Sequence, residues 1–287
     1  MTVHTVHTVR RALAARAYWG LGGPALRRLP AGLGERLPPL AARLARPAAG
    51  VRSAMASALP EAPPEALDRW ALEEARLRLR TRLERLRYPA WTAAAARARV
   101  EVVGAELLEE ALSSGRGAVL VAAHFGVHAM PPLALGLLGW PVNVVRVMRP
   151  DGELGAARGW SQSRRRAMED ALPVRYLDAG HSGAAAALRR GELLTIGGDG
   201  ESVGLITGAP DRTAPLLGRP TAWPTAAFSL AEAAGAPLLW LLPLSRDDRH
   251  LLTIGRLARS DPQRDYIDRY QGWLRDHPGQ WQFWRDR

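Results

Sequence analysis

Hydrophobic and polar positions follow one pattern before residue 100 and another after it. Residues 20–66 combine short helical pieces with many prolines and glycines, which indicates broken helices packed on a larger body. The segment 64–87, PEALDRWALEEARLRLRTRLERLR, predicts one long amphipathic helix with a basic outer face. Its apolar residues recur at roughly helical spacing: Leu67, Trp70, Leu79, Leu83 and Leu86. Such a face is typical of a solvated bundle helix and also suits a membrane or a partner surface.

After residue 100, short apolar runs typical of buried strands alternate with segments of helical spacing. We predict strands at 101–104, 118–123, 142–148, 174–177, 192–198 and 237–245. We predict helices at 105–115, 131–139, 159–171, 183–191 and 224–235. Strands that alternate with helices favour an α/β fold, with a mixed, largely parallel sheet flanked by helices and a helical N-terminal region. The chain then divides into a helical part, 1–99, and an α/β domain, 100–287.

Polar side chains follow three of these predicted strands at the point where each strand ends. His124 follows the run AVLVAA, and Arg149 follows VNVVRVM. Asp199 and Glu201 follow ELLTIGG. Because the carboxyl ends of parallel strands line the ligand crevice of such sheets, these residues predict a site without naming its reaction.

The histidines of HFGVH allow more than one interpretation. A histidine that ends a strand, such as His124, can simply bond a loop carbonyl. His128 follows four residues later, a spacing that suits two metal ligands on one helix, but the internal glutamate of a zinc protease and a third ligand are missing. We therefore expect no metal. The chain has no G-x-S-x-G elbow, and GGDG at 197–200 lacks the full spacing of a phosphate or dinucleotide loop.

Composition narrows the class of protein. The 287 residues are 47% hydrophobic, enough for a globular core, and cysteine is absent, which excludes disulfides and thiolate chemistry. All 39 basic residues are arginines, and the net charge is +11. Compositional drift or an anionic partner can account for this charge. We find no nucleic-acid-binding motif and expect no nucleic-acid partner.

The ten tryptophans and three phenylalanines, together with many arginines, suit a membrane interface, although core tryptophans and solvated arginines fit equally well. No apolar run reaches 18 residues, so a conventional spanning helix is not supported. Residues 1–23 carry a short TVH repeat and an arginine-bearing, weakly amphipathic stretch. This stretch does not resemble a secretory signal, and it is a candidate interfacial anchor.

One family resemblance links these separate segments. AVLVAAHFG at 118–126 resembles the strand and HFG turn of the lipid A biosynthesis acyltransferases, the lauroyl/myristoyl transferase family, whose relatives include mannoside-glycolipid acyltransferases. Other segments are similar to the family's motifs in the same order: Arg149 with Pro150, GELLTIGGDGE at 191–201, LLGRP at 216–220, LAEAAGAPLL at 230–239 and HPGQWQFW at 277–284. The resemblance covers nearly the whole chain.

The resemblance implies transfer of a fatty acyl group from an acyl carrier protein or coenzyme A thioester to a hydroxyl of a membrane glycolipid or related lipid. It implies His124 as the general base, no cofactor beyond the acyl thioester, and substrate binding by Gly126, His128, Arg149 and Arg164. The expected partners are the thioester, the lipid acceptor and an anionic membrane surface. We expect the protein at the cytoplasmic face of the bacterial inner membrane as a peripheral protein, with residues 1–99 next to the membrane through basic helices and exposed tryptophans.

The sequence departs from the family's pattern at one position. The family places a Glu or Asp five residues after the histidine, and here that position is Ala129. We predict that the acid comes from Asp199 or Glu201 and contacts the imidazole nitrogen that faces away from the substrate. The alternative is a protein that kept the fold as a lipid-binding or scaffold protein and lost catalysis.

Overall fold

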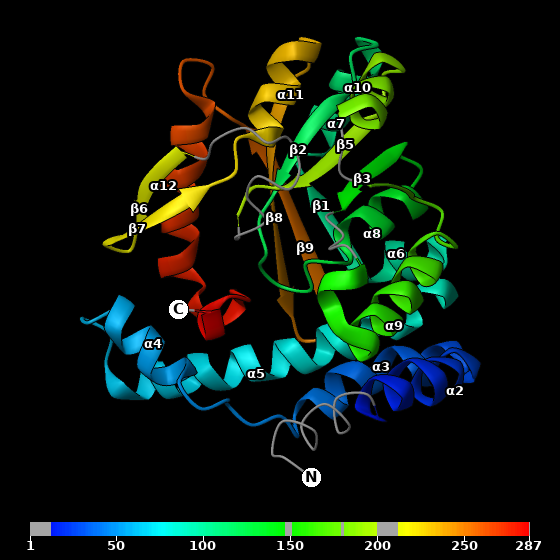
Figure 1. Cartoon of the computed structure of the whole chain (residues 1–287), viewed down its shortest axis with the longest axis vertical. Coiled ribbons are helices and arrows are strands. Elements are labelled where there is room, and N and C mark those ends of the chain that lie inside the picture. Colours follow the sequence, from blue (N-terminus) through cyan, green and yellow to red (C-terminus); the bar gives the residue numbers. More distant parts are fainter. Residues whose placement is uncertain (1–12, 147–150, 179–180, 200–211, 287) are drawn as a thin grey trace.

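The computed structural model describes residues 13–146, 151–178, 181–199 and 212–286 (Figure 1). Its first part is helical, as predicted. In order, the elements are η1 (Ala17–Gly22), α2 (Gly23–Arg28), α3 (Ala31–Ala42), α4 (Val51–Ala58), α5 (Pro64–Arg87), η2 (Tyr88–Ala90) and α6 (Ala93–Arg99).

Helix α5 has the bounds that the sequence predicts. Pro64 stands in its first turn, where a missing N–H costs nothing. The basic outer face is confirmed only in part, because Arg76 and Arg82 are exposed whereas Arg80 and Arg87 are buried. Both buried guanidinium groups donate hydrogen bonds, from Arg80 Nε to the Glu84 carboxylate (2.6 Å) and from Arg87 to the Leu26 carbonyl (2.6 Å).

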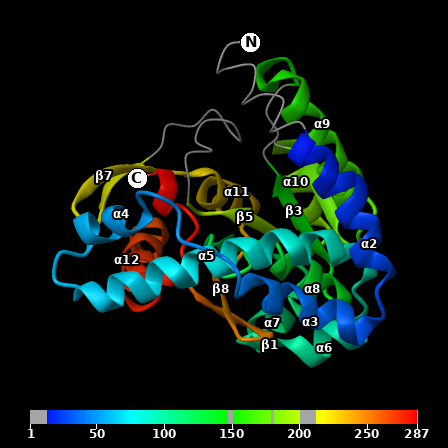
Figure 2. The ribbon, with the colours of Figure 1, turned by 90° about the horizontal axis from the view of Figure 1, so that it is seen from below.

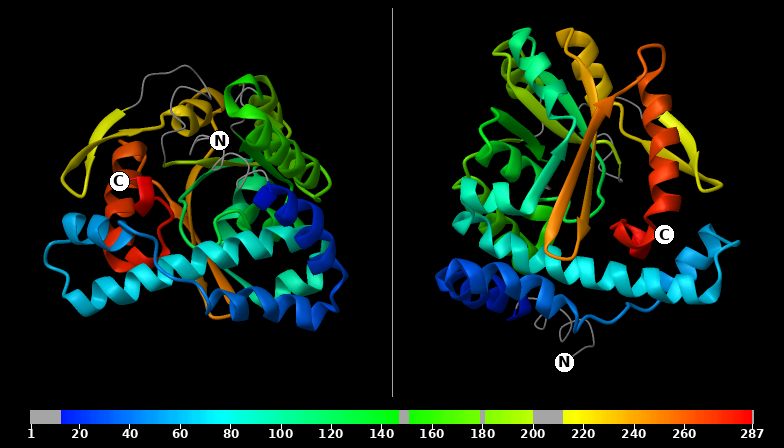
Figure 3. Two further views of the ribbon diagram at one scale, coloured as in Figure 1. Left: turned by 60° about the horizontal axis from the view of Figure 1, so that its bottom comes forward. Right: turned by 180° about the vertical axis from the view of Figure 1, so that it is seen from behind.

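A seven-stranded sheet forms the centre of the rest of the molecule, in the order β1-β9-β8-β2-β5-β3-β4. Its strands are β1 (Val100–Val103), β2 (Ala118–Ala122), β3 (Val142–Arg146), β4 (Arg175–Asp178), β5 (Leu193–Gly197), β8 (Leu238–Arg246) and β9 (Arg249–Arg256). Strands β8, β2, β5, β3 and β4 run parallel, and β9 runs antiparallel to β8 and parallel to β1. Figure 3 shows β8 and β9 as one long hairpin. The predicted mixed, largely parallel sheet is confirmed.

Helices cover both faces of the sheet, which explains why its strands read as continuous apolar runs. In β2, Val119 and Val121 pack into one core, and Ala118 and Leu120 pack into the other. The helices of this part are α7 (Ala105–Ser113), α8 (Pro131–Leu137), α9 (Asp151–Glu169), α10 (His181–Arg189), α11 (Ala226–Ala234) and α12 (Pro262–Asp276). The α/β fold class is therefore confirmed.

Several elements were not predicted from the sequence. They are β9, α12, the two-stranded sheet of β6 (Arg212–Leu216) and β7 (Arg219–Trp223), and the short turns η3 (Pro278–Gln280) and η4 (Trp284–Asp286). Leu217 and Gly218 connect β6 to β7 with φ angles of 48° and 78°. The resemblance placed LLGRP at this turn, and a left-handed pair of residues is what a tight hairpin requires.

Helix α5 crosses the end of the sheet at which β8 finishes (Figures 1 and 2). Its Arg80 donates a hydrogen bond to the carbonyl of Asp247, in the turn between β8 and β9. Met55 of α4 and Leu67 of α5 belong to the same core cluster as Val121 of β2. The core thus continues across residue 100, and the division of the chain into two domains stays a prediction.

Candidate active site

The site forms where two neighbouring parallel strands end. In the register of β2 and β5, Ala122 lies opposite Gly197. His124 and Asp199 each lie two residues beyond these strand ends, so the pairing of the strands brings both side chains to the same edge. The sequence-based rule predicted this proximity, and the structure has it.

Asp199 holds His124 by two hydrogen bonds. The backbone N–H of His124 donates to Asp199 Oδ2 (2.8 Å), and the ring atom Nδ1 lies 2.5 Å from Asp199 Oδ1. A carboxylate at Nδ1 fixes the proton there and leaves the lone pair on Nε2, the arrangement that a general base requires. The His124 side chain is 32% exposed, whereas the Asp199 side chain is 3% exposed.

Two aromatic residues stand behind the carboxylate. Tyr270 of α12 donates its hydroxyl proton to Asp199 Oδ2 (2.5 Å), and Trp281 Nε1 donates to the Tyr270 hydroxyl oxygen (2.5 Å). Sequence reasoning missed Tyr270. The available signal was the helical spacing of Tyr266, Tyr270 and Trp273, which places three aromatic rings on one face of α12.

The surroundings shift the pKa values of His124 and Tyr270. Burial alone lowers the pKa of His124, but the charge and hydrogen bond of Asp199 outweigh it, so that the pKa lies above its usual value. Burial and the nearby Asp199 charge raise the pKa of Tyr270 well above its usual value. Tyr270 therefore stays a neutral hydrogen-bond donor to the carboxylate.

Two glycines before Asp199, Gly197 at the end of β5 and Gly198 after it, leave room for these rings. A Cβ atom on Gly197 would lie 3.1 Å from Cε1 of His124. A Cβ atom on Gly198 would lie 2.4 Å from Val121 Cγ1 and 2.6 Å from Tyr266 Cζ. Close packing thus explains the first two glycines of GGDG, because a side chain on Gly197 would press on the imidazole and one on Gly198 would press on Val121 and Tyr266.

The segment after α12 clamps the histidine turn. Gly126 donates its N–H to the Gln280 carbonyl (3.0 Å), and Gln282 Nε2 donates to the Gly126 carbonyl (3.0 Å). The backbone N–H of Gln282 bonds the His124 carbonyl (3.2 Å), and the Phe283 ring lies 5.1 Å from the imidazole. Gly126 has a φ of 53°, and its Cα faces the Pro243 carbonyl so closely that a Cβ would lie 2.8 Å from it. Glycine is required there by the backbone.

A comparison with protein families places these features in a known group. The family described as bacterial lipid A biosynthesis acyltransferase matches residues 17–266, which include His124 and Asp199. The chain belongs to this family. A comparison with curated protein sequences finds no significant match.

In this acyltransferase family member a second histidine lies beside the first. The rings of His124 and His128 are 4.8 Å apart between centroids, and Nδ1 of His128 is buried without a hydrogen-bond partner among the residues that the structure describes. Burial lowers the pKa of His128 well below its usual value, and the charges of His124 and nearby arginines lower it further. His128 is therefore neutral near pH 7. Its role in substrate binding stays a prediction.

The other candidate residues of this acyltransferase family member are placed as follows. Arg149 and Glu201 lie outside the described residues. Arg164 of α9 is exposed and lies over the Trp160 ring, 5.4 Å from its centroid. The structure brings His124, Gly126, His128 and Asp199 together, and the described contacts do not join Arg164 to them.

Across 13–146, 151–178, 181–199 and 212–286, no group of three or more His, Asp or Glu side chains is arranged to hold a metal ion. Within the same ranges, no helix has the length and apolar character needed to cross a bilayer.

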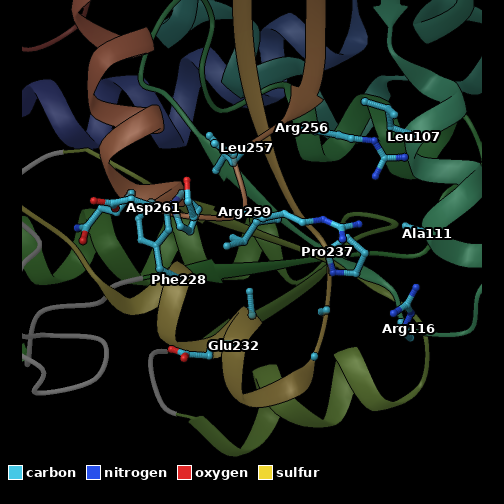
Figure 4. Close-up of a pocket in the computed structure, with 18 of the residues that line it drawn as sticks. Leu107, Ala111, Arg116, Phe228, Glu232, Pro237, Arg256, Leu257, Arg259 and Asp261 are labelled. Atoms are coloured by element: carbon cyan, nitrogen blue, oxygen red, sulfur yellow. The ribbon is translucent and has the colours of Figure 1, made fainter.

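A cavity of about 870 Å³ lies at the opposite edge of the sheet from His124 (Figure 4). Arg116 and Pro237 line it just before β2 and β8 begin, and Arg256 and Arg259 line it from β9 and the loop that follows. Because His124 stands at the other end of β2, this cavity is separate from the histidine site. The chemistry of His124 and Asp199, and not the size of a cavity, identifies the candidate active site.

Proposed function

We propose that this protein transfers a fatty acyl group from an acyl carrier protein or coenzyme A thioester to a hydroxyl of a membrane glycolipid or related lipid. Membership of the acyltransferase family supports acyl transfer to a lipid in general. The thioester donor, the hydroxyl acceptor and the activity of this chain belong to the proposal.

The single observation that carries the proposal is the bond between His124 and Asp199. Nδ1 of His124 lies 2.5 Å from a carboxylate that is itself held by two further donors, the His124 backbone N–H and the Tyr270 hydroxyl. Three donors on one buried carboxylate fix its position. This arrangement supports an orienting acid for the histidine even though Ala129 occupies the position where the resemblance expects one.

The proposed reaction needs one proton to move twice. Nε2 of His124 removes the proton from the acceptor hydroxyl, and at the same time the hydroxyl oxygen attacks the thioester carbonyl carbon. The resulting tetrahedral adduct collapses, the carbon–sulfur bond breaks, and the imidazolium returns its proton to the leaving thiolate. The products are an ester and a free thiol. Asp199 stabilises the imidazolium between the two steps, and the neutral Tyr270 keeps the carboxylate in place.

We propose peripheral attachment to the cytoplasmic face of the inner membrane through the N-terminal helices. The sequence-based expectation of exposed tryptophans was wrong, because all ten lie within the described residues and each is buried or half-buried. Instead, large apolar side chains are exposed on these helices and next to their ends: Leu13, Leu21, Leu33, Leu40 and Leu44. Along α3 and its C-cap, the exposed residues Leu33, Arg36, Leu40 and Arg43 recur every three or four residues. Such a stripe suits an anionic lipid surface.

The test is acyl transfer from acyl carrier protein and coenzyme A thioesters to lipid acceptors in vesicles. His124→Ala should lower the rate on the order of a hundred- to ten-thousandfold, the usual contribution of a general base, while the melting temperature stays close to that of the wild type. Asp199→Asn should also lower it strongly, and His128→Ala should lower it less.

Asp268→Asn is the matched control for Asp199→Asn, since Asp268 is an exposed carboxylate on α12 that pairs with Arg264. It should leave transfer unchanged. If the wild type neither cleaves an acyl thioester nor acylates any lipid, the non-catalytic alternative replaces the proposal. If His128→Ala costs more than His124→Ala, then His128 is the base.

A further inference from the structure

The hairpin of β8 and β9 carries a buried histidine, His250, that takes no part in the proposed reaction. It lies opposite Ser245 in the register of the hairpin, and its ring atom Nδ1 lies 3.0 Å from Ser245 Oγ. On the other side of the ring, Nε2 lies 3.0 Å from Arg80 Nη2 and 3.2 Å from Glu84 Oε2, both on α5. The imidazole therefore bridges α5 and the end of β8.

Ser245 in turn supports the histidine turn. Val127 follows His124 by three residues and is fully buried, so its backbone N–H needs an acceptor inside the protein. Ser245 Oγ is that acceptor, at a distance of 3.1 Å. The preceding residue, Gly126, has a φ of 53° and belongs to the residue type with the greatest backbone freedom. The bond to Ser245 thus restrains the turn directly after its most permissive residue.

The neighbours of His250 decide which ring nitrogen carries the proton. A guanidinium group can only donate, so the hydrogen bond from Arg80 Nη2 occupies the lone pair of Nε2. Burial lowers the pKa of His250, and the charge of Glu84 opposes this effect without reversing it, so the ring is neutral near pH 7. A neutral ring whose Nε2 accepts has its proton on Nδ1, where it points to Ser245 Oγ. A second proton on Nε2 would face Glu84 and would leave the first in place.

Two arginines and a carboxylate hold this arrangement from α5 and α6. Glu84 accepts from Arg80 Nε (2.6 Å) and from Arg99 (3.3 Å). Arg80 also donates to the Asp247 carbonyl, and Arg99 Nε donates to the Asp248 carbonyl (3.0 Å), so both guanidinium groups contact the turn between β8 and β9. The guanidinium that faces the imidazole is therefore fixed in direction.

The order serine, histidine and carboxylate resembles a hydrolytic triad, but its burial gives it a different role. Ser245 is 7% exposed and His250 is 1% exposed, so the row offers no surface to a substrate. The oxygen of Ser245 accepts two N–H groups, from Val127 and from the imidazole, which uses both of its lone pairs. Such an oxygen positions its neighbours.

We propose that His250 is a positioning residue for the histidine turn. Its Nδ1–H fixes Ser245 Oγ as the acceptor of the Val127 N–H, and this bond keeps the turn in the conformation that directs His124 toward the substrate. The inference rests on the proposed acyl transfer. Since His250 acts on the orientation of the base and touches no substrate, its loss should lower kcat and leave the KM values of donor and acceptor unchanged.

The first test uses the wild type alone. The nitrogen-15 chemical shifts of the His250 ring, measured by NMR, distinguish a nitrogen that carries a proton from one that does not. Near pH 7, Nδ1 should carry the proton and Nε2 should be without one. A neutral ring with its proton on Nε2 would overturn the proposal, because Nδ1 would then have no proton to donate to Ser245.

The second test compares two amide side chains of similar polarity, His250→Asn and His250→Gln. The shorter asparagine places an N–H near the position of Nδ1 and can still donate to Ser245, whereas the longer glutamine reaches toward Arg80. In His250→Gln, hydrogen-exchange protection of the Val127 amide should fall about tenfold or more, and in His250→Asn it should stay close to that of the wild type. The Val121 amide in β2 is the internal reference for global stability. Equal protection of Val127 in the two variants would overturn the proposal.

The third test measures acyl transfer by the same variants. In His250→Gln, kcat should fall about three- to thirtyfold with unchanged KM values, and His250→Asn should recover most of this loss. Ser245→Ala, which removes the acceptor itself, should resemble His250→Gln. A raised KM, or an equal fall of kcat in both variants of His250, would overturn the positioning role. If the ring shifts and amide exchange are as expected but the wild type transfers no acyl group, the proposed function alone is contradicted.

Discussion

The His124 imidazole is supported by a row of side chains, in which a carboxylate, a phenol and an indole follow one another. A buried carboxylate is costly unless donors surround it, and Asp199 has three of them: two from His124 and one from Tyr270. Each donor also restrains the direction in which the carboxylate points. The imidazole is therefore held in one orientation before any substrate arrives.

The raised pKa of His124 leads to a prediction about pH. Only the neutral imidazole can act as a base, so kcat/KM should fall as the pH drops through a pKa above the ordinary value of about 6.5. In Asp199→Asn the carboxylate that raises the pKa of His124 is gone, and burial lowers this pKa. The fall of kcat/KM should therefore move to lower pH. The measurement is kcat/KM against pH for the wild type and for the residual activity of Asp199→Asn. The same midpoint of the fall in both proteins would contradict the prediction.

The raised pKa of His124 also makes the stability of the folded protein depend on pH. A histidine whose folded-state pKa is raised stabilises the folded protein below its unfolded-state pKa, and this contribution is lost as the pH rises through the folded-state pKa. The wild type should therefore lose some of its stability advantage over His124→Ala on going from mildly acidic to alkaline pH. Denaturant titrations at both pH values measure the difference.

Tyr270 provides a second prediction for a single atom. Tyr270→Phe removes the hydroxyl that lies between Asp199 and Trp281 and leaves the ring packing in place. We expect kcat to fall about three- to thirtyfold, since the carboxylate loses one neutral donor but keeps the two from His124. Tyr266→Phe is the control, because the Tyr266 hydroxyl is buried and has no hydrogen-bond partner in the described part of the chain. Equal losses in both variants would show that Tyr270 acts only through packing.

Sequence reasoning reached part of this row and not the rest. His124 and Asp199 were predicted to meet because both follow strand ends, and strand order then brings β2 beside β5. Tyr270 comes from a helix whose sequence does not say which side chain faces the sheet. Its position depends on where α12 docks, which is a long-range property of the fold.

Among the elements, the segment after α12 has the largest effect on the site. Gln280 is buried and bonds both backbone groups of Ser245 at the end of β8 (2.9 and 2.8 Å), and its amide also donates to Glu73 of α5 (2.8 Å). Ser245 in turn accepts a hydrogen bond from the Val127 N–H (3.1 Å). One side chain thus connects β8, α5 and the histidine turn.

Gln280→Ala should therefore destabilise the protein and loosen the site together. Leaving the buried Ser245 groups unpaired costs about 1–3 kcal/mol for each unsatisfied group, so the free energy of unfolding should fall by at least about 2 kcal/mol. The rate of acyl transfer should fall as well, measured well below the melting temperature. Gln271→Ala on α12 is the control, since Gln271 is only half-buried and should tolerate the change. If Gln280→Ala is as stable as the wild type, water replaces the side-chain amide of Gln280.

The helices and strands that were predicted from the sequence are those with a strong local pattern of apolar residues. The ends of α5 were predicted because Pro64 begins it and the apolar spacing continues to Leu86. β9 was not predicted, since its alternating sequence RHLLTIGR becomes a strand through pairing with β8 and β1. α12 was not predicted either, because its aromatic face is separated by charged residues that pair along its surface, such as Arg264 with Asp268.

For the whole molecule, the net charge of +11 combines with exposed leucines at the N-terminal helices. Replacing both Leu33 and Leu40 by glutamine should weaken binding to phosphatidylglycerol vesicles about tenfold or more. Each leucine that enters the bilayer contributes on the order of 1–2 kcal/mol to the binding free energy. Vesicle flotation measures this, and binding should also weaken as salt rises. Val103→Gln on β1 is the control, since Val103 is exposed outside these helices. Unchanged flotation of the double variant would place the contact elsewhere.

The clamp between the histidine turn and residues 280–283 also has a consequence for synthesis on the ribosome. His124 leaves the exit tunnel long before Gln280 is translated, so a partly synthesised chain has the base without the residues that hold its turn. We expect such a nascent chain to be inert toward acyl thioesters and to become competent only when this late segment has emerged. The order of translation would then protect the acyl-donor pool from hydrolysis by half-made protein.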